Sequence, residues 1–227
     1  MNDIGAIVYV VDDDPLVRDA VGNLLRSIKL EVRAFSSTEE FAAIDLEERP
    51  SCLVLDVRFV GTAASGLEFQ RDLVARNIRI PIVFLSGHMD VRASVEAMKN
   101  GAVDFLLKPF REQELLDAVR LGLSQDRLRR ERKAGLSDLI ARFETLTPRE
   151  RDLTRLIARG LLGKQIAAEL GVSEVTVKVH RARIMQKLQL HSVVDLVRAV
   201  DLACGAGLDL RGTSLPDPTA RGLVKVG

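Results

Sequence analysis

Aromatic residues are scarce in this chain. Its 227 residues include no tryptophan and one tyrosine, and aromatic side chains make up 4% of the composition, whereas hydrophobic residues make up 47%. So high a hydrophobic content excludes a disordered chain. The composition predicts a soluble protein with cores of Val, Leu, Ile and Ala, and the length allows one large domain or two ordinary ones.

Cysteines and long apolar runs are also few. The two cysteines, Cys52 and Cys204, are interpreted as independent thiols, because one lies in a predicted strand and the other near the end of the chain. No apolar run reaches the ~18 residues of a membrane span, and the opening Met-Asn-Asp lacks the form of a signal peptide. We therefore expect a cytoplasmic protein without a membrane partner.

Charge is distributed unevenly along the chain, although the formal net charge is +1. Residues 1–110 carry 12 Lys and Arg against 17 Asp and Glu, whereas residues 141–203 carry 11 against 7. A basic C-terminal part beside an acidic N-terminal part is typical of a nucleic-acid-binding module attached to a regulatory one. An excess of this size also fits an ordinary solvated surface.

Apolar runs in the first half predict strands separated by amphipathic helices, and they cover residues 6–11, 51–55, 80–85 and 104–107. This alternation predicts an α/β fold with a doubly wound parallel sheet. Polar residues stand at or just beyond the C-terminal ends of these runs, namely Asp12, Asp13, Asp56, Ser86 and Lys108. Ligands of such sheets bind at that edge, so the sequence predicts a site there for Mg²⁺ and a phosphoryl group.

The second half of the chain predicts an all-α helix-turn-helix domain. Thr147, Pro148 and Glu150 form the pattern of a capping box at the start of a helix. A short helix over residues 164–170 and a longer, basic one over residues 174–188 follow, joined by a turn that contains glycine. Two helices in this arrangement are typical of proteins that read the major groove of DNA.

The basic helix is expected to bury Val175, Val179, Ile184 and Leu188. Six of its residues are candidate DNA contacts, whether to bases or to the backbone: Lys178, Val179, His180, Arg181, Arg183 and Lys187. A fourth helix over about residues 192–203 carries an apolar face of Val193, Leu196, Val197 and Val200. The other helices would cover that face only in part, which favours a dimer contact there.

A long helical pattern begins after Lys108-Pro109-Phe110 and carries an apolar stripe of Leu115, Leu116, Val119, Leu123 and Leu128. Residues 123–142 are interpreted as a helical linker. The Arg-rich stretch 126–133 within it is read as a solvated face, with DNA backbone contact as the alternative. Residues 204–227, rich in Gly, Pro, Ser and Thr from Leu208 onwards, are predicted to form a disordered tail.

Five motifs in order carry a family resemblance: Asp12-Asp13, Leu55-Asp56-Val57-Arg58, Leu85-Ser86-Gly87, the stretch 101–110 with sequence GAVDFLLKPF, and Thr176-Val177-Lys178-Val179-His180. With them, residues 4–122 resemble the receiver domain of two-component response regulators, and the domain is assigned to residues 1–122. Residues 143–203 resemble a LuxR-type helix-turn-helix domain, and the whole resembles the FixJ/NarL class of transcription factor. The resemblance implies a flavodoxin-like receiver domain, a linker helix and a DNA-binding domain, in a regulator that is not an enzyme.

The resemblance also implies roles for the polar residues at the sheet edge. Asp56 would accept a phosphoryl group from the phosphohistidine of a sensor histidine kinase. Asp13 and Asp56, with the backbone carbonyl of Arg58, would bind Mg²⁺ directly, and Asp12 would act through a coordinated water. Lys108, turned by a cis bond to Pro109, and the Ser86 hydroxyl would contact the phosphoryl oxygens.

Signal transmission in this family implies further expectations. Ser86 and Phe105 would act as the switch pair, with an ordinary core role for Phe105 as the alternative. Phosphorylation would produce a homodimer that binds double-stranded promoter DNA, with RNA polymerase as a further partner.

Two departures from the family pattern affect these expectations. The loop over residues 59–66 is about two residues longer than usual and lacks its proline, which leaves the geometry beside the metal open. Leu162-Gly163 replaces the polar pair that usually begins the second helix, so a weak N-cap is expected there.

Two other classes of protein remain as alternatives. A phosphatase that forms an aspartyl phosphate would need Asp-x-Asp at the nucleophile, where this chain has Asp56-Val57-Arg58. In a phosphorelay or partner-binding protein, the C-terminal helices would bind protein instead of DNA.

Overall fold

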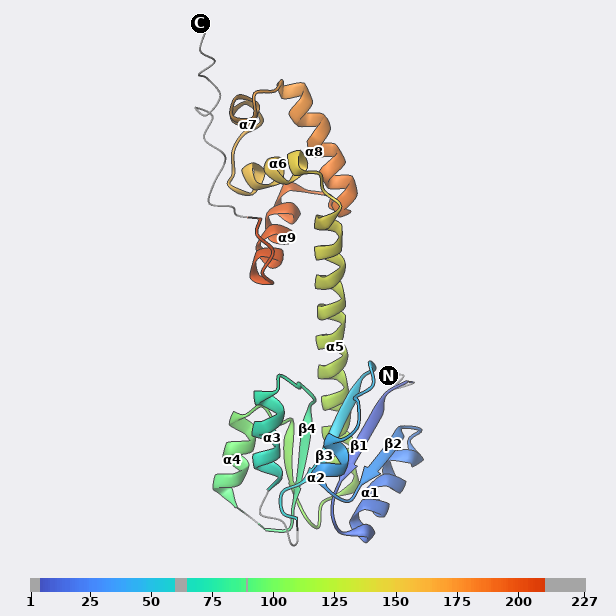
Figure 1. Ribbon diagram of the computed structural model, residues 1–227. Coiled ribbons are helices and arrows are strands. Elements are labelled where there is room, and N and C mark those ends of the chain that lie inside the picture. The colour runs from blue at the N-terminus through green and yellow to red at the C-terminus, as the bar shows by residue number, and fades with distance from the viewer. Residues whose placement is uncertain (1–4, 60–64, 89, 211–227) are drawn as a thin grey trace, which may run out of the picture. The chain divides into compact units, whose positions relative to one another are not determined.

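The computed structural model describes residues 5–59, 65–88 and 90–210. The chain forms two compact units, residues 1–131 and 132–227, and the boundary between them lies inside helix α5 (Figure 1). Among the described residues, no helix is both long enough and apolar enough to cross a membrane.

The first unit contains a five-stranded parallel sheet in the order β2-β1-β3-β4-β5. The strands are β1 Ile7–Val11, β2 Glu31–Phe35, β3 Ser51–Asp56, β4 Ile82–Ser86 and β5 Asp104–Leu107. This order is that of flavodoxin-like, doubly wound sheets. The predicted fold class of this unit is confirmed.

Helices cover both faces of the sheet. Helices α1 (Pro15–Ser27) and the first part of α5 (Glu112–Glu144) pack on one face, and α2 (Thr38–Ala42), α3 (Gly66–Ala75) and α4 (Val91–Lys99) pack on the other. Every residue of β1, β3 and β4 is therefore buried. Strands covered on both faces are continuous apolar runs in sequence, which is why these three were predictable.

The sequence prediction missed strand β2, which pairs with β1 along its full length. It is an edge strand, and Glu31, Arg33 and Ala34 are exposed to solvent. An edge strand does not need an apolar run, so the pattern that identified the other strands is missing here.

Helix α5 is longer than the predicted linker, because it runs through Gly135 to Glu144. Its first part is buried as expected at Leu115, Val119 and Leu123, but Leu128 is 52% exposed, so its place in the apolar stripe was wrong. The buried position after Leu123 belongs instead to a carboxylate.

That carboxylate is Asp126, which has no exposed surface. It accepts a hydrogen bond from the Ser51 N–H at 3.0 Å, at the start of β3, and one from Arg130 Nε at 2.6 Å. Arg129 pairs with the same carboxylate. Part of the Arg-rich stretch is therefore engaged within the first unit, and it fixes α5 to the strand that ends at Asp56.

The second unit consists of α6 (Pro148–Ala158), α7 (Gly163–Leu170), α8 (Glu174–Leu188) and α9 (Val193–Gly205), together with the end of α5. The predicted capping box is present: Thr147 Oγ1 accepts from the Glu150 N–H, and the Glu150 carboxylate accepts from the Thr147 N–H at 2.8 Å. At α7 the N-cap residue is Leu162, whose side chain makes no capping hydrogen bond, as expected. Gln165 Oε1 instead accepts a hydrogen bond from the Leu162 N–H.

The start of the predicted tail is corrected by the structure. Helix α9 continues to Gly205, and Leu210 is 3% exposed because it packs into the core of this unit. Leu208 and Leu210 make apolar contacts with this core, and a prediction based on the Gly, Pro and Ser content of the segment overlooks them. Residues 211–227 lie outside the described residues.

Candidate functional site

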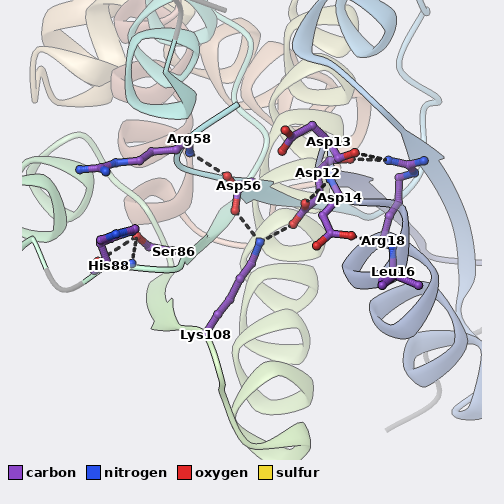
Figure 2. Close-up of polar contacts among 10 residues, drawn as sticks. All are labelled: Asp12, Asp13, Asp14, Leu16, Arg18, Asp56, Arg58, Ser86, His88 and Lys108. Atoms are coloured by element: carbon purple, nitrogen blue, oxygen red, sulfur yellow. Dashed lines mark hydrogen bonds and ion pairs between the residues drawn. The ribbon is translucent and has the colours of Figure 1, made fainter. Parts of the chain in front are cut away.

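Three of the predicted site residues meet at the C-terminal edge of the sheet. Asp12 follows β1, Asp56 is the last residue of β3, and Lys108 follows β5. The Lys108 ammonium lies 2.6 Å from Asp12 Oδ2 and 2.6 Å from Asp56 Oδ1, and so bridges the two carboxylates (Figure 2). The Lys108–Pro109 peptide bond is cis, as expected.

The two carboxylates are almost completely removed from solvent. The side chains of Asp12 and Asp56 are 2% and 7% exposed, against 21% for Lys108. Burial raises the pKa of Asp56 and outweighs the hydrogen bond from Lys108, which lowers it. For Lys108, burial acts to lower the pKa, but the hydrogen bonds to Asp12 and Asp56 prevail and raise it. The site thus places two buried carboxyl groups against the single ammonium group of Lys108.

Local hydrogen bonds orient both carboxylates. Asp56 Oδ2 accepts from the Arg58 N–H at 2.7 Å, and Asp12 Oδ1 accepts from the Asp14 N–H at 3.0 Å. Asp14 itself caps α1 by accepting from the Leu16 N–H at 2.8 Å. Of the three consecutive aspartates, Asp14 thus performs the ordinary capping role.

The loop after Asp56 returns close to the strand at Gly66. A Cβ atom built on Gly66 would lie 2.2 Å from the Asp56 carbonyl oxygen, so only glycine fits the start of α3. Within this loop, residues 60–64, the longer part of the predicted departure from the family pattern, lie outside the described residues.

The two predicted switch residues each have partners of their own in this structure. The Ser86 hydroxyl donates to the His88 carbonyl at 2.9 Å and accepts from the His88 N–H at 3.3 Å, and Figure 2 shows this pair apart from Lys108. Phe105 is partly buried, with its ring centroid 6.1 Å from that of Phe84. Ser86 would have to exchange its present partners to bind a phosphoryl oxygen.

The donor chemistry of the site suits Mg²⁺, which prefers a few carboxylate or carbonyl oxygens and retains several waters. Asp12, Asp13 and Asp56 supply such oxygens, and Asp13 lies beside Asp12 in Figure 2. Within the described part of the chain, no group of three or more metal-binding side chains is arranged as a complete site. Lys108 occupies the position between Asp12 and Asp56 where a cation is favoured.

A second candidate surface lies on α8, the longer helix of the helix-turn-helix. Gly171 ends α7 in the left-handed conformation, and Ser173 caps α8. Lys178, Arg181 and Arg183 are exposed on α8. Backbone N–H groups and cations at the start of such a helix are suited to contact DNA phosphates and bases.

The buried face of α8 differs from the prediction. Val175 is 72% exposed and Val179 is 45% exposed, so their predicted burial was wrong. Val177, Ile184 and Leu188 form the buried face instead. Their spacing of seven and four residues is the helical period, and this signal could have been found.

Two other predicted contact residues of α8 have partners inside the unit. Lys187 donates to the Glu150 carboxylate at 2.6 Å and to the Thr145 carbonyl at 3.3 Å. His180 is half-buried, and its Nδ1 atom has no partner among the described residues. Both residues therefore present less to an external ligand than their neighbours Lys178 and Arg181.

These features define a class of protein, and comparison with known families agrees. The family model described as "Response regulator receiver domain" matches residues 8–120, and the model described as "Bacterial regulatory proteins, luxR family" matches residues 144–200. The chain belongs to the response regulators that combine a receiver domain with a LuxR-type DNA-binding domain.

Individual relatives resemble the chain over most of its length. Nodulation protein W of Bradyrhizobium diazoefficiens is 51% identical over 85% of this chain and 84% of its own. Response regulator protein TodT of Pseudomonas putida is 44% identical over 88% of each. The solved structure of response regulator StyR has a TM-score of 0.75 and 47% identity, covering 86% of this chain and 98% of its own.

Proposed function

We propose that this chain is a transcriptional regulator activated by phosphorylation of Asp56, with a sensor histidine kinase as the phosphoryl donor. The observation that carries the proposal is the pair of buried carboxylates bridged by Lys108 at 2.6 Å. A buried anion beside a fixed ammonium is suited to accept a group that brings further negative charge.

In the proposed reaction, an oxygen of Asp56 forms a bond to phosphorus while the phosphorus–nitrogen bond of the donor phosphohistidine breaks. The leaving imidazole keeps the bonding electron pair and takes a proton. Lys108 supplies positive charge to the phosphoryl oxygens, and the Arg58 N–H holds the second oxygen of Asp56. Mg²⁺, when bound by Asp13, Asp56 and the Arg58 carbonyl, with Asp12 acting through water, supplies the remaining charge neutralisation.

Asp56→Asn tests this assignment because it removes the nucleophile and nearly preserves shape. We expect the variant to take up no label from acetyl phosphate in the presence of Mg²⁺, whereas wild type takes it up stoichiometrically. Asp104→Asn is the matched control, because Asp104 lies at the start of β5, at the other end of that strand from Lys108. Stable labelling of the Asp56→Asn chain would contradict the assignment.

The proposed output is binding of a homodimer to promoter DNA through α8, with RNA polymerase as the partner that responds. Lys178→Ala and Arg181→Ala test the DNA surface, because both side chains are exposed and neither is part of the core. A residue that contacts a phosphate should lose affinity on every sequence and lower the salt slope by roughly one. A residue that contacts a base should lose about 1–3 kcal/mol on the cognate site alone.

The control for this surface is Arg76→Ala, an exposed arginine at the end of α3 in the first unit, outside both the helix-turn-helix and the Arg-rich stretch 126–133. It should leave the affinity for a selected DNA site nearly unchanged. Unchanged affinity in Lys178→Ala and Arg181→Ala together would contradict α8 as the DNA-binding helix and would favour a partner-binding role for the second unit.

A further inference from the structure

Arg18 is a charged residue at the candidate site that no sequence motif singled out. It lies in the first part of α1, and its guanidinium turns back toward the loop that follows β1 (Figure 2). Nη1 donates to the Asp12 carbonyl at 2.6 Å and to the Asp13 carbonyl at 3.3 Å. One side chain thus holds the backbone of both adjacent acidic residues.

Other hydrogen bonds of this loop fix the remaining polar groups of Asp12. The Asp12 N–H donates to the Phe35 carbonyl, Asp12 Oδ1 accepts from the Asp14 N–H, and Asp12 Oδ2 accepts from Lys108. Asp12 is therefore fixed through its N–H and its carboxylate, and Arg18 fixes its carbonyl. The Asp13 carbonyl accepts a hydrogen bond from the same guanidinium.

The Arg18 guanidinium and the carboxylates of Asp12 and Asp13 lie on different sides of the loop that follows β1. Figure 2 shows the guanidinium meeting the loop on the side away from Lys108, with the carboxylates of Asp12 and Asp13 directed to the other side. A hydrogen bond from a charged donor is roughly twice as strong as a neutral one. Arg18 therefore restrains the peptide groups from which both side chains extend, without occupying the space where those side chains converge.

We propose that Arg18 is a positioning residue that presents Asp12 and Asp13 to Mg²⁺. The inference rests on the proposed function, because it assigns Arg18 to the cation site of the phosphorylation reaction. Partners that orient metal ligands typically change metal affinity by about 10- to 100-fold when they are removed. Arg18 acts on the affinity for the cation and leaves the phosphoryl-transfer step itself to Asp56 and Lys108.

The test compares Arg18→Met, which keeps the aliphatic stem and removes the donors, with Arg18→Lys, which keeps the charge on a single donor nitrogen. Mg²⁺ binding to the full, unphosphorylated chain is measured by calorimetry. We expect affinity to fall by about tenfold or more in Arg18→Met and by less in Arg18→Lys. Arg26→Met is the control and should bind Mg²⁺ as wild type does, because Arg26 is an exposed arginine in the last turn of the same helix and its guanidinium donates to Asn23.

A second measurement separates positioning from general loss of structure. The phosphorylation rate with acetyl phosphate is followed as a function of Mg²⁺ concentration, and saturating Mg²⁺ should restore the rate of Arg18→Met to near the wild-type maximum. Unchanged Mg²⁺ affinity in Arg18→Met, or a lowered maximum with unchanged affinity, would overturn the proposal. If wild type itself takes up no phosphoryl group, the proposed function fails, whereas the calorimetric comparison still decides the role of Arg18.

Discussion

At Asp56, burial and an ion pair act on one carboxyl group in opposite directions. Burial raises its pKa and the hydrogen bond from Lys108 lowers it, with a net upward shift. A raised pKa means that ionisation of Asp56 costs folding free energy. The stability contribution of its protonated form is complete below the unfolded-state pKa and is lost as pH rises through the folded-state pKa. A buried anion that is costly for the fold is also one that gains from a bound cation.

Lys108→Met should raise the pKa of Asp56 further, because it removes the interactions that lower this pKa and leaves the charge of Asp12, which raises it. Carbon-13 titration of the carboxyl groups without Mg²⁺ measures the shift directly. Lys99→Met, at an exposed lysine in the last turn of α4, is the control. A pKa for Asp56 equal to or below the wild-type value in Lys108→Met would mean that the ion pair contributes nothing.

Residues of the candidate site were predictable to different degrees. Asp12, Asp56 and Lys108 were identifiable because each follows an apolar strand, and the strand ends of a parallel sheet share one edge. Arg18 and the Glu150–Lys187 pair were not, since their contacts depend on side-chain direction across one turn or between helices. The partners of Ser86 were also beyond the sequence, because a hydroxyl group can turn to any nearby acceptor.

At the scale of elements, burial patterns explain both the successes and the errors. Strands β1, β3, β4 and β5 and the limits of α8 were recognised from apolar runs and caps. Strand β2 was missed at the sheet edge, and on α8 Val175 and Val179 were assigned to the core where Val177 is buried instead. On α5, Leu128 was assigned to the core where Asp126 is buried instead. A buried carboxylate needs several donors at once, and no local pattern shows that Ser51 and two arginines will supply them.

Two glycines of α5 should respond oppositely to the same substitution. A Cβ atom on Gly122 would lie 2.8 Å from Cys52 Sγ and 3.3 Å from Pro81 Cβ, whereas one on Gly135 would meet nothing within 4 Å. We expect Gly122→Ala to destabilise the first unit by about 1–3 kcal/mol through overpacking. Gly135→Ala should stabilise the helix by about 0.5–1 kcal/mol.

Thermal unfolding of the full chain, followed separately for the two units by calorimetry, measures both effects. Each alanine serves as the control for the other, because the chemical change is identical. A stabilising Gly122→Ala would show that α5 is not seated as closely on β3 as the structure indicates.

At the scale of the whole molecule, the proposed function assigns the phosphoryl group to the first unit and DNA to the second. A phosphoryl group at Asp56 can change DNA affinity only if it stabilises one state of the chain over another. We expect beryllofluoride with Mg²⁺, a mimic of the phosphoryl group, to raise both the dimer population and the affinity for DNA. Sedimentation with and without operator DNA measures the two together, and Asp56→Asn is the control.

The same linkage requires DNA to strengthen beryllofluoride binding by an equal factor, since coupling between two binding sites is reciprocal. A chain that stays monomeric yet gains affinity at a single half-site would contradict dimer formation as the mechanism. It would favour release of a blocked α8 instead.

Because α5 packs closely on β3, the reactivity of Cys52 can report how often this contact opens. Cys52 has no exposed surface, and burial, with the nearby charge of Asp126, raises its pKa to about 12. At neutral pH the buried thiol is therefore protonated, and the thiolate is the form that alkylating reagents attack. Cys204 is half-buried in the second unit, so free cysteine in solution serves as the exposed reference thiol.

Alkylation of Cys52 must therefore wait for α5 to lift from the strand. Its rate, divided by that of a fully exposed thiol, gives the equilibrium constant for this local opening. We would measure this constant with and without beryllofluoride. The ratio of the two values gives the change in the free energy of opening between α5 and β3, the strand that carries Asp56. An unchanged constant would mean that the signal leaves the first unit while this contact stays closed.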